Sequence, residues 1–503
     1  MSRRNARFVH GGWLHGGPSE RLRCAAVGRA DEYVEAEWRY GVRYPIAGRT
    51  IADNQGGFSM QHRRPPRRSR LLSRAVGTAG ALAVVLGAGI APASAATKAP
   101  GAPATGFSPD EDVPWAPTKD EAPLQHKSVH PATTHGRTEA DSVQLNLPAP
   151  TGRYPVGTVS LHLVDTSRTD PYVSGNTPRE LMVSVWYPAA ATSGHAQAPW
   201  MPPVSGASFL ASRGLSPEQV SLPETAGHVL APVDTKLGKL PVLLYSTGLH
   251  SDRAMGTALV EDLASRGYIV ITVDHTHDAN EVEFPGGRLE TDAMPSNAHS
   301  SHTVAVRAAD IHFVINQLAR IAKGGDPDVD HTKLPAGLAG AVDMSRIGMF
   351  GWSLGGAAVP PSMQLDSRIA AGADLDGQFF GPATRENLNR PVMLFSSGTH
   401  NRNDDSSWRT FWSHLTGYRL DIQLKGSAHL SFSDNETMVP QEAGLLGLSQ
   451  SDLQQQFGTI DPNRAINVQR VYLAAFFDQQ LRDKHSTLLD GPNKRYPEIN
   501  FVR

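Results

Sequence analysis

Residues 347–356 are Ile-Gly-Met-Phe-Gly-Trp-Ser-Leu-Gly-Gly, a short apolar run that ends in the spacing Gly351-x-Ser353-x-Gly355. The run predicts a buried strand, and the two glycines predict a sharp turn from that strand into a helix. Small residues are needed there because the backbone doubles back and the strand and helix pack closely. Such a turn presents the Ser353 hydroxyl above the sheet. It also leaves the backbone N–H of Leu354 free to bind an oxyanion.

Apolar strands alternate with amphipathic helices on both sides of this motif. Continuous apolar runs are typical of strands that are covered on both faces. The alternation therefore predicts an α/β fold with a mainly parallel central sheet and helices on both faces. The expected strands are Leu181–Tyr187, Lys239–Ser246, Tyr268–Asp274, Ile369–Asp376, Val392–Ser396 and Tyr418–Leu424, and the expected helices are Met255–Arg266, Thr303–Ile321, Trp408–Leu415 and Pro462–Arg482.

The adjacent prolines Pro360 and Pro361 lie where the helix after Ser353 should run. A proline inside a helix removes a hydrogen bond and costs roughly 3 kcal/mol. We therefore expect this helix to be short or kinked.

A Gly-x-Ser-x-Gly match can also arise by chance in a chain with 47 glycines, so the interpretation depends on partners for the serine. A serine hydroxyl needs a base to become a nucleophile, and the base needs an orienting acid. In this fold class the acid and then the histidine follow the serine, each in a loop after a strand. The histidines after Ser353 are His400, His414, His429 and His485.

His429 is the predicted base, because it follows a predicted strand within the small-residue loop Gly426-Ser427-Ala428-His429. His400 also follows a strand, but at the point in the chain order where an acid is expected, and it is the alternative. His414 falls within a predicted helix, and His485 follows the last one.

The residues alone leave three positions open for the acid. Asp374 and Asp376 lie two apart at the end of one predicted strand and so point to the same side. Asp376 precedes Gly377 and is better placed to turn toward His429. Asp404 and Asp405 follow the next strand, the commoner place for the acid in this fold, within a polar run that is interpreted as a solvated loop.

The loop after the strand Lys239–Ser246 is the expected second half of the oxyanion hole. Its sequence is Thr247-Gly248-Leu249-His250, and the N–H of Leu249 is the predicted donor. The nearby His250, His275, His277 and Asp274 also suggest a metal site, but polar residues commonly line a pocket at this edge of a sheet. We therefore expect neither a metal nor a cofactor.

The N-terminal region predicts export. Six arginines lie between residues 63 and 74, and the uncharged residues 75–95 end in Ala93-Ser94-Ala95. This order predicts a secretory signal peptide over residues 60–95, by either the Sec or the twin-arginine route. A membrane anchor is the alternative, which the Gly- and Ala-rich composition disfavours. Residues 1–59 lack sustained periodicity and are interpreted as an extraneous extension.

Composition narrows the classes of function. Residues 96–150 are rich in Pro, Ala and Thr and predict a flexible linker, which leaves residues 151–503 as one catalytic domain. The single cysteine, Cys24, lies in the predicted extension, so cysteine-nucleophile and metal-thiolate chemistry are excluded from the mature chain. Residues 1–95 contain 15 arginines and 6 acids, a charge of +9, and the whole chain is −2, so the mature part is −11. An acidic exported chain is not expected to bind nucleic acid.

These motifs together resemble the secreted platelet-activating-factor acetylhydrolase family, a lipid-esterase branch of the α/β-hydrolases. The resemblance extends over roughly residues 152–482. It includes the oxyanion loop Tyr245-Ser-Thr-Gly-Leu249, in which Thr247 stands where the family usually has histidine. It also includes the nucleophile turn Gly351-Trp-Ser-Leu-Gly-Gly356, in which Trp352 stands where the family usually has histidine. Further matches are Gly152–Gly157, Val185–Pro188, Pro199–Pro202 and the segment Gly426–Asp434. Asp374-Leu375-Asp376 resembles the segment that provides the family's acid, which implies Asp376.

The resemblance implies a secreted serine esterase that cleaves short acyl chains from small lipid or ester substrates, with Ser353, His429 and Asp376 as its triad. Transient contact with a lipid surface is a further expectation. A lipase or cutinase-like polyester hydrolase with the same triad is the alternative. A binding protein on a hydrolase scaffold is the third hypothesis, which the presence of all three triad residues disfavours.

Overall fold

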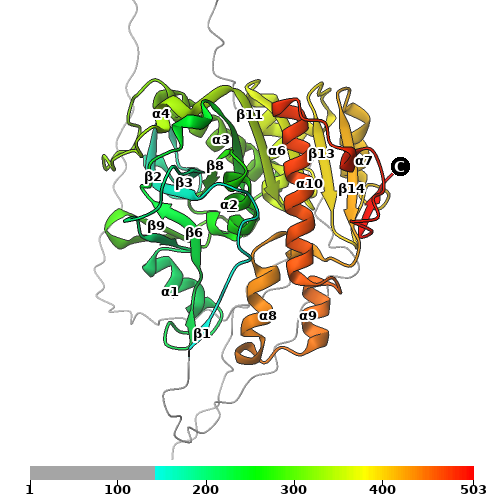
Figure 1. Ribbon diagram of the computed structural model, residues 1–503, viewed down its shortest axis with the longest axis horizontal. Coiled ribbons are helices and arrows are strands. Elements are labelled where there is room, and N and C mark those ends of the chain that lie inside the picture. Colours follow the sequence, from blue (N-terminus) through cyan, green and yellow to red (C-terminus); the bar gives the residue numbers. More distant parts are fainter. Residues whose placement is uncertain (1–141) are drawn as a thin grey trace, which may run out of the picture.

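An eleven-stranded sheet runs through residues 142–503, the part of the chain that the computed structural model describes (Figure 1). The predicted N-terminal extension, signal peptide and nearly all of the linker lie outside the described residues. From one edge to the other, the strands are β15 (Ile499–Phe501), β14 (Arg419–Leu424), β13 (Val392–Ser396), β12 (Ile369–Leu375), β11 (Val342–Trp352), β7 (Leu240–Ser246), β8 (Ile269–Val273), β3 (Pro178–Pro188), β2 (Val156–Thr169), β6 (Glu224–Val229) and β4 (Gln197–Pro199).

The six strands from β14 to β8 all run parallel to their neighbours. Antiparallel pairs join β8 to β3, β3 to β2, β4 to β6 and β14 to β15. Every residue of β7, β8 and β13 is buried, as expected for parallel strands with both faces covered. The prediction of an α/β fold with a mainly parallel sheet is confirmed.

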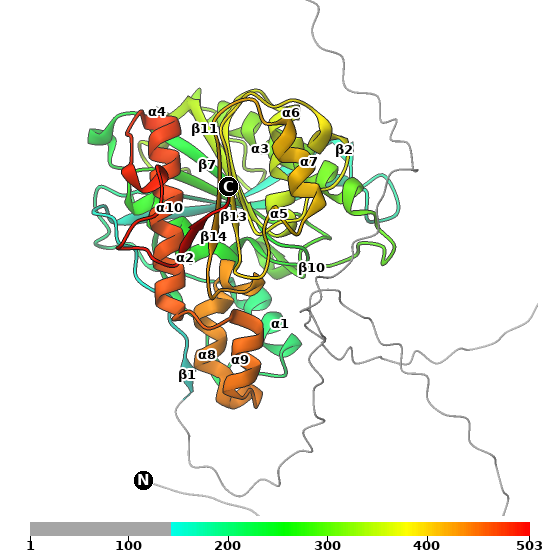
Figure 2. The same ribbon diagram turned by 90° about the vertical axis from the view of Figure 1, so that its right-hand side faces the viewer.

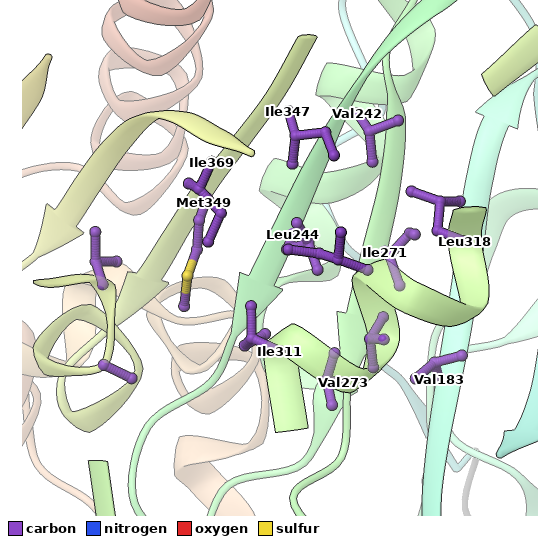
Figure 3. Close-up of a cluster of buried hydrophobic side chains, with 14 of the residues drawn as sticks. Val183, Val242, Leu244, Ile271, Val273, Ile311, Leu318, Ile347, Met349 and Ile369 are labelled. Atoms are coloured by element: carbon purple, nitrogen blue, oxygen red, sulfur yellow. The ribbon is translucent and has the colours of Figure 1, made fainter. Parts of the chain in front are cut away.

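Helices cover both faces of the sheet, which Figure 2 shows nearly edge-on. One face holds α3 (Ser300–Ala322), α5 (Leu354–Ala357), α6 (Val359–Leu365) and α7 (Ser406–His414), and the other holds α2 (Thr257–Ser265) and α10 (Pro462–Arg482). On the first face, Ile311 and Leu318 of α3 belong to one buried cluster with Leu244, Ile271 and Met349 of the sheet (Figure 3). This packing fixes α3 beside the strands that end at the site.

A smaller group of elements lies beyond one end of the sheet and was not predicted from the sequence. It contains α1 (Pro203–Ser212) together with the consecutive helices α8 (Asn435–Leu446) and α9 (Gln450–Phe457), which come much later in the chain (Figure 1). Phe209 and Leu210 of α1 share a hydrophobic cluster with Met438 of α8. The remaining strands and α-helix are short: β1 (Val143–Gln144), β5 (Val220–Ser221), the hairpin β9 (Glu281–Phe284) and β10 (Arg288–Thr291), and α4 (Leu338–Ala341). No helix in residues 142–503 is long and apolar enough to cross a bilayer.

The helix after Ser353 is divided in two, as the prolines predicted. The first piece, α5, has only four residues, and α6 begins at Val359 with its prolines in the first turn. The first turn is the part of a helix where a missing N–H costs least, because those groups have no intrahelical acceptor. The chain thus accommodates Pro360 and Pro361 by starting a new helix.

Candidate active site

The turn at Ser353 is as tight as its glycines predicted. Ser353 has φ 55° and ψ −124°, a conformation that non-glycine residues rarely adopt. A Cβ on Gly351 would lie 2.3 Å from the carbonyl carbon of Gly355, and one on Gly355 would lie 2.0 Å from the carbonyl oxygen of Ser246. Backbone atoms cannot move out of the way cheaply, so both positions require glycine. The strained turn projects Ser353 from the junction of β11 and α5.

Ser353, His429 and Asp376 lie within hydrogen-bond distance in series. His429 Nε2 is 2.9 Å from Ser353 Oγ, and His429 Nδ1 is 2.8 Å from Asp376 Oδ2. Ser353 and Asp376 are buried, whereas the His429 side chain is 22% exposed. A ring that bridges a hydroxyl and a carboxylate in this way can take the hydroxyl proton while the carboxylate balances the resulting charge.

The Asp376 carboxylate has two partners besides His429. The residue follows β12 with φ 59°, which turns its side chain toward the loop after β14. Its Oδ1 accepts the backbone N–H of Ser397 at 2.7 Å and lies 3.0 Å from Nδ1 of His400. Burial alone would raise the pKa of Asp376, but the hydrogen bonds from His400 and His429 outweigh it and hold the pKa far below its usual range.

The other candidate acids do not touch His429. Asp374 is fully buried, its Oδ1 accepts the N–H of Gly377 at 2.9 Å, and burial raises its pKa well above the ordinary value. Asp404 is exposed and binds the amide of Asn401. The expectation of a solvated loop is wrong for Asp405, which is 9% exposed. Asp405 is buried because its Oδ1 caps α7 and its Oδ2 lies 3.0 Å from Nε2 of His400.

The remaining candidate histidines also lie elsewhere. His400 contacts Asp376 and Asp405 rather than Ser353. His414 bonds the carbonyl of Thr410 at 2.8 Å within α7, and His485 lies 3.1 Å from Gln479 Oε1. Of the histidines that follow Ser353 in the described residues, the fold brings His429 to the serine.

The predicted oxyanion loop is fixed from behind by Arg307 of α3. The guanidinium of this buried arginine donates to the carbonyls of Thr247 and Gly248 and forms a two-bond pair with Asp278. Within residues 142–503, neither the N–H of Leu249 nor that of Leu354 donates a hydrogen bond. Leu249 also lines the cleft that contains Ser353. The sequence did not reveal this role of Arg307, because the residue lies 60 positions from Thr247 in the chain. The helix that carries it was predicted from its apolar face alone.

The side chains that suggested a metal site in the sequence form separate ion pairs with different partners. Asp274 pairs with Arg253, His277 lies 3.0 Å from Asp170, and His250 lies 3.5 Å from Asp292. In residues 142–503, no cluster of three or more His, Cys, Asp or Glu side chains is placed to hold a metal ion.

His275 belongs to a second serine-histidine-aspartate arrangement. Its Nε2 is 2.9 Å from Ser246 Oγ, and its Nδ1 is 3.0 Å from Asp310 Oδ2. Each of these residues is 0% exposed, so no substrate reaches Ser246. Burial lowers the pKa of His275. We interpret this arrangement as structural.

A cleft of about 120 Å³ contains Ser353 and His429. The aromatic ring of Trp352 forms one wall, lies 5.4 Å from the His429 ring and donates its indole N–H to the His429 carbonyl at 3.0 Å. Other walls come from α1 and α8, so the segments that the sequence did not reveal complete the site. They contribute Phe209, Arg213 and Asn435.

A larger cavity of about 340 Å³ lies on the other side of Asp252 and Glu281 and contains none of the triad residues. Both carboxyl groups also line the cleft at Ser353. Burial raises the pKa of Glu281 to about 7, and burial together with Glu281 raises that of Asp252. A raised carboxyl pKa favours the neutral form, so burial makes this wall less negative than two ordinary carboxylates would.

Comparisons with known proteins show the family to which the chain belongs. The family model of platelet-activating factor acetylhydrolase, isoform II, matches residues 139–284 and 288–493. A relative from Arthroderma benhamiae, named probable 1-alkyl-2-acetylglycerophosphocholine esterase, is 30% identical over 387 residues, covering 71% of this chain and 93% of the relative. The platelet-activating factor acetylhydrolase of Gallus gallus is 25% identical over 50% of this chain and 66% of its own.

A solved structure is also similar. The ferulic acid esterase from Streptomyces cinnamoneus superposes with a TM-score of 0.61 at 35% identity, covering 71% of this chain and 99% of its own. The family match, the esterase relatives and the α/β architecture point to one class of enzyme. The protein is a carboxylic ester hydrolase and belongs to the family of platelet-activating factor acetylhydrolase, isoform II.

Proposed function

We propose that this esterase cleaves short acyl chains from lipid-type esters through a Ser353–His429–Asp376 triad, and that it does so outside the cell. The observation that supports the triad most strongly is the pair of hydrogen bonds at the His429 ring: Nε2 accepts from Ser353 Oγ at 2.9 Å, and Nδ1 donates to Asp376 Oδ2 at 2.8 Å. A ring with both of these bonds has its proton on Nδ1 and a free electron pair on Nε2 facing the hydroxyl.

The mechanism follows from that arrangement. Ser353 Oγ attacks the ester carbonyl carbon while His429 Nε2 takes the hydroxyl proton, and the carbonyl oxygen becomes an oxyanion. The N–H groups of Leu249 and Leu354 donate to that oxyanion. His429 then gives the proton to the departing alkoxide. The alcohol is released, and the acyl group remains bound to Ser353 as an acyl-serine. Water attacks the acyl-serine with the same proton transfers, and the carboxylic acid and the free serine are released.

The size of the cleft favours a small acyl group. Sites that enclose a drug-sized ligand are about 300–1,000 Å³, and the space at Ser353 is about 120 Å³. A short acyl chain fits within it while the alcohol part of the substrate extends outward. The name of the Arthroderma benhamiae relative, an esterase of an acetylated glycerophosphocholine, supports the same class of substrate.

A second candidate activity is the hydrolysis of ferulate-type aromatic esters. It is favoured by the similarity to the Streptomyces cinnamoneus esterase, which is 35% identical and matched over nearly its full length. A feruloyl group is larger than an acetyl group, so this activity requires the walls of the cleft to open. Long-chain lipase or polyester hydrolase activity requires a larger opening still.

Export is supported by the charge and composition of residues 60–95. We expect cleavage after Ala95, and N-terminal sequencing of the exported protein tests this. A mature protein that retains the Gly- and Ala-rich segment would contradict the proposal.

One experiment tests the catalytic proposal. A fluorophosphonate probe should label the wild-type protein at Ser353 and should fail to label Ser353→Ala. A substrate panel of p-nitrophenyl acetate, p-nitrophenyl palmitate, methyl ferulate and an acetylated ether phospholipid should give the highest kcat/KM for the acetyl esters. Labelling of the Ser353→Ala variant would refute the nucleophile, and preference for palmitate or ferulate would refute the substrate class.

A further inference from the structure

Asp376 contacts two histidines, and the proposed mechanism uses only one of them. His429 lies at Oδ2, while Nδ1 of His400 lies 3.0 Å from Oδ1. The other ring nitrogen of His400, Nε2, lies 3.0 Å from Asp405 Oδ2. His400 thus bridges two carboxylates, with a side chain that is 12% exposed.

This bridge determines the protonation of His400. A neutral imidazole has one N–H donor and one nitrogen acceptor, and only imidazolium donates from both nitrogens. A carboxylate oxygen accepts but does not donate. With a carboxylate at each nitrogen, both hydrogen bonds form only when His400 carries two protons and a positive charge.

We propose that His400 is a positioning residue for catalysis: as an imidazolium between Asp376 and Asp405, it orients the triad acid and offsets part of its negative charge. The inference rests on the proposed function of Asp376 as that acid. His400 does not touch the substrate or the serine. It acts through Asp376, so its effect is on the proton equilibrium of the catalytic base.

The charged groups around His400 support its positive charge. Burial alone lowers the pKa of His400, but Asp376 and Asp405 outweigh burial and raise it to about 10. Behind them, Asp374 is fully buried and its pKa is raised well above the ordinary range by burial. From β14, Asp421 lies 3.0 Å from Arg402, and burial raises its pKa to about 7.

The ring of His400 is also fixed by packing. It lies 4.6 Å from the ring of Trp408 on α7, whose indole N–H donates to the carbonyl of Gly377. The backbone carbonyl of His400 accepts from Gln423 of β14 at 3.1 Å. The ring of His400, in the loop after β13, is therefore held against Asp376, which directly follows β12.

The consequence for catalysis is electrostatic. General-base catalysis requires that His429 be unprotonated in the free enzyme, and the acid limb of the kcat/KM profile reports that equilibrium. A positive charge on the far side of Asp376 opposes the binding of a second proton at His429. His400 thereby extends activity toward acidic pH.

The test replaces the charge and keeps the length of the side chain. In His400→Gln, the midpoint of the acid limb of kcat/KM should rise by about one pH unit, since a nearby charge moves a titration by about 1–3 units. At pH values below the wild-type midpoint, kcat/KM of His400→Gln should therefore be about tenfold lower than that of the wild type at the same pH. The matched control is His312→Gln on α3, where His312 Nδ1 lies 2.8 Å from Asp366 Oδ2 and the side chain is 42% exposed. This control should leave the midpoint unchanged.

A merely structural role would lower the melting temperature or the plateau rate of His400→Gln without moving the midpoint, and that result would overturn the proposal. A second measurement covers the case in which the variant does not fold. In the ¹⁵N-histidine-labelled wild-type protein, NMR should show both ring nitrogens of His400 protonated up to pH 8. A neutral His400 ring at pH 7 would overturn the inference even if fluorophosphonate labelling had established Ser353. Labelling of Ser353→Ala by the fluorophosphonate probe would instead refute the proposed function.

Discussion

Replacing Asp376 by asparagine tests the assignment of the acid with a change of a single side-chain atom. In the native site, Asp376 Oδ2 accepts from His429 Nδ1 at 2.8 Å, and Oδ1 accepts from the backbone of Ser397 at 2.7 Å. The amide of Asp376→Asn keeps its oxygen toward the Ser397 N–H, so its NH₂ group faces His429 Nδ1. A ring that accepts at Nδ1 carries its proton on Nε2, and that proton points at Ser353 Oγ. The base is then blocked.

The expected loss follows from two effects. The wrong tautomer prevents His429 from taking the serine proton, and the lost carboxylate no longer stabilises the imidazolium that forms in the transition state. Together these lower kcat by about 10³–10⁴, which corresponds to about 4–5.5 kcal/mol of transition-state stabilisation at about 1.4 kcal/mol per tenfold. KM should change much less, because Asp376 lies behind His429 and away from the cleft.

The assay is kcat and KM on p-nitrophenyl acetate for four variants, with circular dichroism melting to check folding. Asp404→Asn is the matched control, because Asp404 is exposed and should retain activity within about twofold. Asp374→Asn should also remain active, since Asp374 does not contact His429 and an amide oxygen can still accept the Gly377 N–H that Asp374 Oδ1 binds at 2.9 Å. Asp405→Asn should lose less than about tenfold, because it acts on Asp376 only through His400.

Asp376 is not the triad acid if folded Asp376→Asn keeps more than about a tenth of wild-type kcat. The assignment also fails if Asp405→Asn shows the large loss while Asp376→Asn does not. In that case the acid would lie after β13, and the short distance between Asp376 and His429 would have no catalytic meaning.

Three further outcomes follow from particular contacts. Gly355→Ala should abolish fluorophosphonate labelling and lower the melting temperature, because its Cβ would lie 2.0 Å from the carbonyl oxygen of Ser246. The control is Gly444→Ala in α8, where a Cβ meets open space, and it should leave the stability unchanged or raise it. Arg307→Lys should lower kcat by about 10–100-fold with little change in KM, because one ammonium cannot hold the oxyanion loop and Asp278 together; an unchanged kcat would contradict this. Burial raises the pKa of Glu261 to about 8 from 4.5, so the folded protein binds more protons than the unfolded chain between these values and wild-type stability falls as pH rises. Denaturation of Glu261→Gln should therefore show a stability advantage over wild type that grows by about 1 kcal/mol per pH unit from pH 5 to 8, and a constant difference would contradict the assignment.

The sequence was most informative where one local pattern determines one local structure. Continuous apolar runs identified the strands of the parallel core, and the glycines around Ser353 identified a turn that only glycines allow. Pro360 and Pro361 predicted the break between α5 and α6 for the same reason: the backbone preference of a residue needs no distant partner. The long strand β2 was missed because its C-terminal part, Asp165–Thr169, is polar and largely exposed and so breaks the apolar run.

The sequence by itself determined the fold class and nominated Ser353 and His429, because each of these depends on residues within a few positions in the chain. From the residues alone, the acid remained open among neighbouring aspartates, and the tertiary structure shows that Asp376 is the one that contacts His429. The end of β12 at Leu375 and the positive φ of Asp376 bring its carboxylate to His429, while Asp405 turns to cap α7. Arg307 had no sequence signal, and His400 was indicated only as an alternative base, since their contacts with Gly248 and Asp376 join segments far apart in the chain. Electrostatic and hydrogen-bond partners depend on distance in space, and only the packing of α3 and of the loops after β12 and β13 against the sheet sets those distances.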